Sequence, residues 1–204
     1  MHEKLPCTLI TWEDVYDLCR QLAQQLHKAN FRIDIIVAIA RGGYIPGRLL
    51  SDMLGLYDLT CFKMEHYQGA YKQQAAFVKY PLNANINGQN VLLLDDVCDS
   101  GDTFEIGIEH IRHCGAVNEI RTAALHLKTV SKFIPDFYVE KVCEWRWLIY
   151  PWAVNEDLSS MIAKMQLVNP DVMLLQQLIK QRHDINVTCQ QIEDALTLIP
   201  MPPS

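Results

Sequence analysis

The stretch Val91-Leu92-Leu93-Leu94-Asp95-Asp96-Val97-Cys98-Asp99-Ser100-Gly101-Asp102-Thr103 decides the fold. Its first four residues are apolar and predict a strand buried on both faces, which is typical of a parallel sheet. Two carboxylates end this apolar run, and a polar turn then leads into a predicted helix over 104–114. The acidic pair therefore lies at the carboxyl end of a central strand, where open α/β sheets bind their ligands.

The turn 99–103 has the features of a phosphate site, because free N–H groups and the helix dipole favour an anion at a helix N-terminus. The same stretch also carries four carboxylates, which repel phosphate. These carboxylates therefore indicate a second binding function, such as holding sugar hydroxyls or a divalent cation that the phosphates share. A ligand with both a ribose diol and phosphates satisfies every part of the loop.

These thirteen residues resemble the phosphoribosyl diphosphate (PRPP) binding motif of the type I phosphoribosyltransferases. The resemblance implies that Asp95 and Asp96 hold the ribose hydroxyls and a Mg²⁺ ion. It also implies that the 5′-phosphate binds to Asp99, Ser100, Gly101, Asp102 and Thr103, with Asp99 as the acid/base catalyst. An ordinary strand-to-helix turn with solvated acids is the alternative, which the composition and the strand–turn–helix context disfavour.

A second buried-strand run, 33–40, ends in Arg41-Gly42-Gly43 and is followed by a predicted helix over 45–54. A glycine pair lets the backbone turn tightly and approach a ligand, and a guanidinium suits phosphate oxygens. The segment resembles the diphosphate loop of the xanthine-guanine and hypoxanthine phosphoribosyltransferases. That resemblance implies that Arg41 and Gly42 bind the diphosphate leaving group and that a cis peptide bond lies near Arg41.

Residues for a base lie further along the chain. A predicted strand over 119–127 is followed by Lys128, and Trp147 and Leu148 lie in a later aromatic segment. In the purine enzymes a lysine binds the exocyclic oxygen of a 6-oxopurine, an aromatic ring stacks on the base, and the next residue's backbone contacts the base. The resemblance assigns these roles to Lys128, Trp147 and Leu148. Packing of the aromatic residues in the core is the alternative for Trp147.

One position departs from the family pattern. Where the purine enzymes carry an acid after the aromatic segment, this chain has Ala153, with Glu156 and Asp157 shifted along the sequence. We expect phosphoribosyl transfer from PRPP to a 6-oxopurine (hypoxanthine, guanine or xanthine), in purine salvage. The departure leaves open a non-catalytic or weakly catalytic regulator that senses PRPP or a nucleotide, and an enzyme that uses a pyrimidine or an amine.

Composition favours an enzyme rather than a nucleic-acid or membrane protein. The chain has 204 residues, half of them hydrophobic, and a formal net charge of −6, which disfavours nucleic-acid binding. It has no run of eighteen apolar residues and no apolar N-terminal stretch, so neither a membrane span nor a signal peptide is expected. Seven scattered cysteines without a Cys-x-x-Cys pair indicate reduced thiols and a cytoplasmic protein.

The order of elements predicts a doubly wound α/β fold with a mainly parallel central sheet, because strands and helices alternate. We expect a phosphoribosyltransferase domain over 1–153, with a hood over 128–153, and a helical C-terminal extension over 154–204. The extension carries three helical patterns and suggests packing or self-association, as a homodimer or higher oligomer.

Residues 65–83 lack periodicity and predict a flexible loop, which in the family closes over PRPP and excludes water. Tyr67, Tyr71 and Lys72 are the candidates to cap the diphosphate. A two-stranded ribbon is the alternative for this segment.

Overall fold

The structure, a computed structural model of the whole chain, describes residues 4–66, 76–167 and 170–199. The chain divides into two compact units, Val15–Glu144, here called the sheet unit, and Met1–Asp14 with Trp145–Ser204, here called the tail unit. Each unit has its own core, and each is described by itself. The predicted domain boundary between 153 and 154 stays a prediction.

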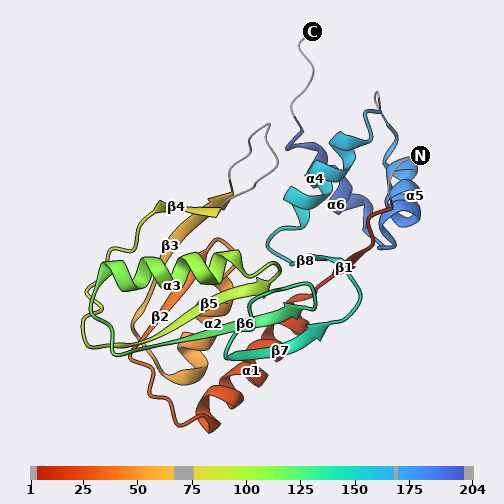
Figure 1. Cartoon of the computed structure of the whole chain (residues 1–204). Helices are drawn as coiled ribbons and strands as arrows, with labels where there is room; N and C mark the ends of the chain where they lie inside the picture. The colour runs from red at the N-terminus through yellow and green to blue at the C-terminus, as the bar shows by residue number, and fades with distance from the viewer. Residues whose placement is uncertain (1–3, 67–75, 168–169, 200–204) are drawn as a thin grey trace. The chain divides into compact units, whose positions relative to one another are not determined.

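The sheet unit is built on six strands in the order β4-β3-β2-β5-β6-β7, of which only the β3–β4 pair is antiparallel. This confirms the predicted mainly parallel α/β fold. The strands are β2 (Ile35–Ala40), β3 (Leu59–His66), β4 (Ala76–Tyr80), β5 (Asn90–Cys98), β6 (Glu119–Lys128) and β7 (Phe137–Val142) (Figure 1).

Helices cover both faces of this sheet, as expected for a doubly wound fold. Gly107 of α3 (Asp102–Cys114) lies against the side chains of Leu93 and Phe62. Gly47 of α2 (Tyr44–Leu54) lies against Leu94. Leu93 and Leu94 are neighbours on β5 and point to opposite faces, so α3 and α2 pack on opposite sides. The third helix, α1, spans Trp12–Lys28.

The central strands are hydrophobic throughout because both faces are covered. All six residues of β2 are buried, and so are Val91 to Leu94 of β5. One cluster joins α3 to one face of the sheet and includes Val37, Phe62 and Leu93. This packing fixes the positions at which the strands end.

The predicted loop 65–83 is partly strand. Glu65 pairs with Phe77 and His66 with Ala76 in the antiparallel β3–β4 ladder. The ribbon alternative is therefore correct for these residues. Tyr67, Tyr71 and Lys72 lie outside the described residues, so their predicted roles stay predictions.

The tail unit contains the two-stranded parallel sheet of β1 (Cys7–Leu9) and β8 (Trp147–Ile149). Three helices pack with it, α4 (Val154–Lys164), α5 (Val172–His183) and α6 (Cys189–Leu196), as the three helical patterns predict. Their common core comprises Cys7, Ile149, Leu158, Met161, Ile162, Leu175, Ile179 and Ile192, together with neighbouring residues. The C-terminal helices and the β1–β8 pair therefore form one folded body.

Side-chain hydrogen bonds join the two ends of the chain within this unit. Arg146 donates to the Cys7 carbonyl oxygen from Nη2 at 2.6 Å and to Thr8 Oγ1 from Nε at 2.9 Å. His183 Nδ1 lies 3.0 Å from the Leu5 carbonyl oxygen. The N-terminal strand is thus held both by β8 and by the last turn of α5.

Candidate active site

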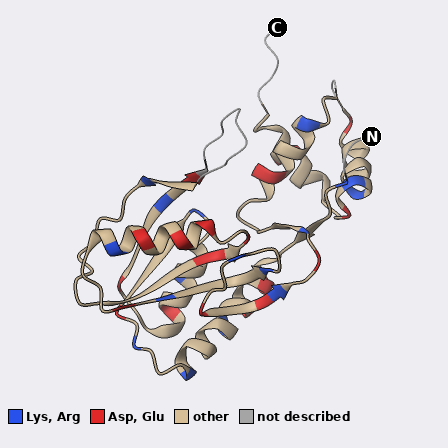
Figure 2. Cartoon of the chain, in the orientation of Figure 1, with Lys and Arg blue, Asp and Glu red and all other residues tan. Residues whose placement is uncertain are grey.

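The carboxyl ends of β2, β5 and β6 bring most of the sequence-predicted site residues to one edge of the sheet. Ala38 of β2 pairs with Leu94 of β5, and Cys98 of β5 pairs with Leu127 of β6. Arg41 and Gly42 follow β2, and Lys128 ends β6. In Figure 2, acidic positions (red) mark the last part of β5 and the helix α3 that follows it. This edge is the candidate active site.

Asp95 and Asp96 occupy different environments although they are neighbours. Asp95 is buried and Asp96 is half-buried, and the Asp96 N–H donates to Asp95 Oδ1 at 3.0 Å. Burial raises the pKa of the Asp95 carboxyl well above its ordinary value, and the negative charge of Asp96 adds to the rise. A cation or hydroxyl donors beside these two carboxylates would relieve their repulsion.

Gly42 brings the loop after β2 against the acidic pair. A Cβ atom built at this position would lie 2.5 Å from Asp96 Oδ1, closer than a side chain can approach. An alanine here would have to displace the Asp96 carboxylate, so glycine lets the two loops meet in this way. The peptide bond between Ala40 and Arg41 is cis, as the family resemblance implies, and Arg41 is exposed at the strand end.

The turn from β5 into α3 has the geometry of a helix N-terminus. Gly101 is the N-cap residue with φ +97°, a left-handed conformation that favours glycine. The N–H groups of Phe104 and Glu105 both donate to the Gly101 carbonyl oxygen, and these are the first hydrogen bonds within the helix. The backbone N–H groups before Phe104 therefore have no partner inside the helix. Ser100 and Asp102 are exposed beside them. This arrangement can bind a phosphate.

A second loop, Thr129–Phe133, supports this turn. The sequence did not indicate this support. The Lys132 N–H donates to the Ser100 carbonyl oxygen at 3.1 Å. The rings of Phe104 and Phe133 stack with centroids 5.4 Å apart. Cys98 Sγ lies 3.3 Å from Ser131 Oγ, which places this cysteine in packing behind the turn. These contacts join residues about thirty positions apart, and no local pattern encodes them.

Lys128 and Asp99 are paired. Lys128 Nζ donates to Asp99 Oδ2 at 2.7 Å, and the lysine side chain is only 4% exposed whereas that of Asp99 is 44% exposed. A buried ammonium group needs such a partner. The residue predicted to bind the base and the predicted acid/base catalyst therefore form one charge-neutral pair.

Trp147 and Leu148 belong to the tail unit. Both lie on β8, where Trp147 pairs with Cys7 and Leu148 with Thr8 of β1. The Trp147 side chain remains 39% exposed. Ala153 is the N-cap residue of α4, so the position that carries an acid in the purine enzymes here begins a helix.

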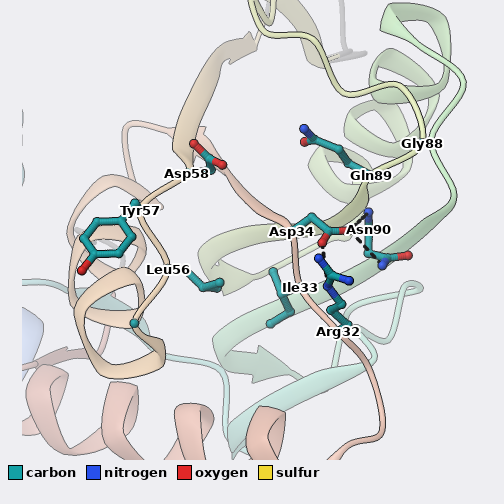
Figure 3. A pocket seen from close by; sticks show the side chains of 10 residues that line it. Arg32, Ile33, Asp34, Leu56, Tyr57, Asp58, Gly88, Gln89 and Asn90 are labelled. Carbon is teal, nitrogen blue, oxygen red and sulfur yellow. Dashed lines mark hydrogen bonds and ion pairs between the residues drawn. The ribbon is translucent and has the colours of Figure 1, made fainter.

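A hollow of about 760 Å³ lies at the opposite, amino-terminal edge of the sheet (Figure 3). Asp34 accepts hydrogen bonds there from the N–H and side-chain amide of Asn90, each at 2.9 Å, and pairs with Arg32. In Figure 3 the side chains of Asp58 and Gln89 extend toward one another. None of the sequence-predicted site residues that the structure describes lines this hollow.

Three further observations bear on the predictions. Within the described ranges, no group of three His, Cys, Asp or Glu side chains is arranged to hold a metal by itself. The helices that are described include none long and apolar enough to cross a bilayer. All seven cysteines lie in the described residues and are free thiols.

A family model of the phosphoribosyl transferase domain matches residues 9–157. The chain belongs to this phosphoribosyltransferase family. This phosphoribosyltransferase is 30% identical over 145 residues to the xanthine-guanine phosphoribosyltransferase of Gluconobacter oxydans, covering 70% of this chain and 82% of that protein. It is 28% identical over 144 residues to the protein of the same name from Vibrio vulnificus, covering 71% and 87%.

Two solved structures have a similar fold. The purine phosphoribosyltransferase of Pyrococcus horikoshii superimposes with a TM-score of 0.63 at 32% identity, over 71% of this chain and 93% of that one. A hypothetical protein from Neisseria gonorrhoeae, solved with bound ppGpp, superimposes with a TM-score of 0.64 at 26% identity, over 82% of this chain and all of that one.

Proposed function

We propose that this phosphoribosyltransferase transfers the 5-phosphoribosyl group from PRPP to a 6-oxopurine, giving a nucleoside 5′-monophosphate and diphosphate. The observation that carries the proposal is the carboxyl edge of the sheet. A buried and a half-buried carboxyl group, a glycine against the second of them and a helix N-terminus lie at this edge. Together they offer groups for the hydroxyls and the phosphates of PRPP. The names of the curated relatives support a purine, and xanthine and guanine among the purines.

The ribose part of PRPP is assigned to Asp95 and Asp96, and its 5′-phosphate to the turn 99–103. Arg41 and the backbone at Gly42 bind the diphosphate, whose negative charge grows as its bond to C1 of the ribose breaks. A base nitrogen forms the new bond to C1, and the base gives up a proton near its N7, which the Asp99 carboxylate accepts. General acid–base help of this kind contributes about 10²–10⁴-fold.

The base is assigned to three residues. Lys128 donates a hydrogen bond to the exocyclic oxygen of the 6-oxopurine. Lys128 is paired with Asp99 in the structure. The residue that binds the exocyclic oxygen is therefore in contact with the residue that accepts the proton. Trp147 stacks on the base, a contact worth about 1–3 kcal/mol in nucleic-acid sites, and the backbone of Leu148 contacts its edge.

The donor set fits Mg²⁺. This ion prefers oxygen ligands and is commonly held by one or two carboxylates together with substrate phosphates, so Asp95 and Asp96 suffice as its protein ligands. The raised pKa of Asp95 agrees, because a nearby cation would stabilise the ionised form. If bound by Asp95 and Asp96, Mg²⁺ would supply positive charge that neutralises the diphosphate.

The test is a diphosphate-release assay with PRPP, Mg²⁺ and a panel of hypoxanthine, guanine, xanthine, adenine, uracil and orotate. Turnover with a 6-oxopurine is the expected result. Turnover with uracil or orotate alone would replace the purine assignment by a pyrimidine one. The Asp99→Asn variant, which keeps the size of the side chain, is the matched control and should lose the activity.

A regulatory protein is the second candidate, and Ala153 favours it because the family's acid is missing there. The Neisseria gonorrhoeae neighbour with bound ppGpp shows that a protein of this fold holds a guanine nucleotide. For a sensor, PRPP or ppGpp would raise the melting temperature of this chain while no base of the panel releases diphosphate. Cytoplasmic location and self-association stay predictions.

A further inference from the structure

The turn that leads from β5 into α3 has a flexible residue at its centre. Gly101 has φ +97°, and its neighbours Ser100 and Asp102 are exposed. Glycine has more backbone conformations open to it than other residues, so fixing it in one conformation costs more conformational entropy. A phosphate that binds to backbone N–H groups needs these groups in fixed directions. Contacts from another part of the chain can supply this rigidity.

The loop 129–133, which follows β6 in the same unit, brings its backbone against this turn. The Lys132 N–H donates to the Ser100 carbonyl oxygen at 3.1 Å. A Cβ atom built at Gly101 would lie 3.0 Å from the Phe133 backbone nitrogen and would clash with the Phe133 Cβ atom. Glycine at position 101 therefore permits the close approach of this loop in addition to the left-handed φ.

Side chains of the loop contact the chain on both sides of the turn. After the turn, the Phe133 ring stacks on the fully buried Phe104 ring of α3, with centroids 5.4 Å apart and planes 3° from parallel. Before the turn, the Ser131 hydroxyl oxygen lies 3.3 Å from the sulfur of Cys98, the last residue of β5. The loop therefore packs against the residues that precede the predicted phosphate site and against those that follow it.

Hydrogen bonds within the sheet unit hold the loop itself in place. The Ser131 N–H donates to the Lys128 carbonyl oxygen at 3.0 Å. The Ser131 hydroxyl donates to the Phe133 carbonyl oxygen at 2.7 Å and accepts from the Phe133 N–H at 3.2 Å. The Thr129 N–H donates to the carbonyl oxygen of Val142, the last residue of β7, at 3.2 Å. Phe133 is thus presented to the turn from a fixed backbone.

We propose that Phe133 is a positioning residue for the 5′-phosphate, which holds the turn 99–103 in the conformation that binds the phosphate group. It acts through Gly101 and Phe104 rather than on the ligand. The inference rests on the proposed function, in which this turn binds the 5′-phosphate of PRPP. A turn that is already ordered loses less conformational freedom when the phosphate arrives, which increases affinity.

Packing alone is the competing explanation, because the half-buried Phe133 also lies against the core cluster that contains Phe104. A residue that only contributes to packing would lower the free energy of unfolding when it is truncated. In the protein that remains folded, it would leave the preference for phosphorylated ligands unchanged. A positioning residue would lower the affinity only for ligands that carry the 5′-phosphate, so the ratio of two affinities separates the explanations.

Four variants make the test. Phe133→Ala removes the ring, and Phe133→Leu keeps an apolar side chain of intermediate size. Ser131→Ala removes the hydroxyl that bonds to the Phe133 backbone and contacts Cys98. Ile134→Ala is the matched control, because Ile134 is the next residue along the chain, is also a large apolar residue and is 69% exposed.

Calorimetric binding of guanosine 5′-monophosphate and of guanosine gives the first readout, since the two ligands differ only in the 5′-phosphate. Phe133→Ala should lower the ratio of the two affinities about 10-fold, with the affinity for guanosine within about two-fold of the parent. Phe133→Leu should recover part of this loss, Ser131→Ala should lower the ratio about 3-fold, and Ile134→Ala should match the parent. These measurements do not depend on turnover.

Steady-state kinetics give the second readout. Phe133→Ala should raise KM for PRPP about 10-fold and leave KM for the base within about two-fold of the parent. An unchanged ratio of affinities in folded Phe133→Ala would overturn the inference. If Phe133→Ala does not fold, an unchanged ratio in Ser131→Ala would overturn it. If the parent binds guanosine 5′-monophosphate no more tightly than guanosine, the phosphate assignment of the proposed function is wrong instead.

Discussion

The two edges of the six-stranded sheet use carboxylates in opposite ways. At the amino-terminal edge, Asp34 has Asn90 and Arg32 as partners, so its charge is balanced within the protein beside an open hollow. At the carboxyl-terminal edge, Asp95 is buried beside a second carboxylate and its pKa is raised. The difference teaches that a hollow alone does not mark the site. A buried carboxyl group whose pKa is raised marks it better, because a cation or hydroxyl donors can stabilise its charged form.

The largest expected effect concerns Asp99. Asp99→Asn should lower kcat by about 10²–10⁴-fold, because the amide cannot accept the proton of the base. It also leaves the buried Lys128 with a weaker partner, which should lower the free energy of unfolding by about 1–3 kcal/mol. Single-turnover kinetics and urea unfolding measure the two effects separately. A variant that transfers phosphoribosyl groups at the parent rate would remove Asp99 from catalysis.

Gly42→Ala should have the next largest effect. The new Cβ would displace the Asp96 carboxylate, and a displacement of this kind lowers kcat/KM for PRPP by about 10- to 100-fold. The control is Gly88→Ala near the other edge, where φ is +70° and no atom lies within 4 Å of the built Cβ. That variant should lose about 1–2 kcal/mol of stability to backbone strain and keep its kcat/KM. Equal kinetic losses in both variants would contradict the functional difference between the edges.

At the amino-terminal edge, Asp34→Ala should affect stability and leave kinetics unchanged. The substitution leaves the half-buried N–H groups of Asn90 without their acceptor, which costs about 1–3 kcal/mol. Asp34→Asn keeps an acceptor oxygen and should lose less. The midpoint of urea unfolding and kcat/KM for PRPP are the measurements. A loss of kcat/KM in folded Asp34→Ala would assign this edge a part in the reaction.

Arg32→Ala should have the smallest effect. The Arg32 side chain is 86% exposed, and exposed ion pairs contribute only about 0–1 kcal/mol. Urea unfolding at low and high salt checks this, with a smaller difference expected at high salt. A larger loss than that of Asp34→Ala would mean that the ion pair, rather than the bonds to Asn90, stabilises this edge.

Much of the fold follows from local sequence patterns. The apolar runs before Asp95 and Arg41 predict buried parallel strands, and the structure confirms both. The three helical patterns of the tail are confirmed as α4, α5 and α6. The segment 65–83 was harder to predict, because the alternation in Ala76–Tyr80 is short and its pairing partner is the end of β3, earlier in the chain. An edge strand of this kind depends on tertiary pairing more than on its own pattern.

The sequence by itself determined which chemical groups this protein presents and at which ends of which strands. The motif residues lie at fixed sequence distances from the end of a strand. The carboxylate pair, the glycine turn and the helix N-terminus can therefore be predicted from the local sequence. The tertiary structure alone decided which of these groups are partners. The Lys128–Asp99 ion pair and the support of the turn by Phe133 depend on packing and on burial of charge. These quantities arise only when the chain has folded, because they depend on distances in space and on exclusion of water.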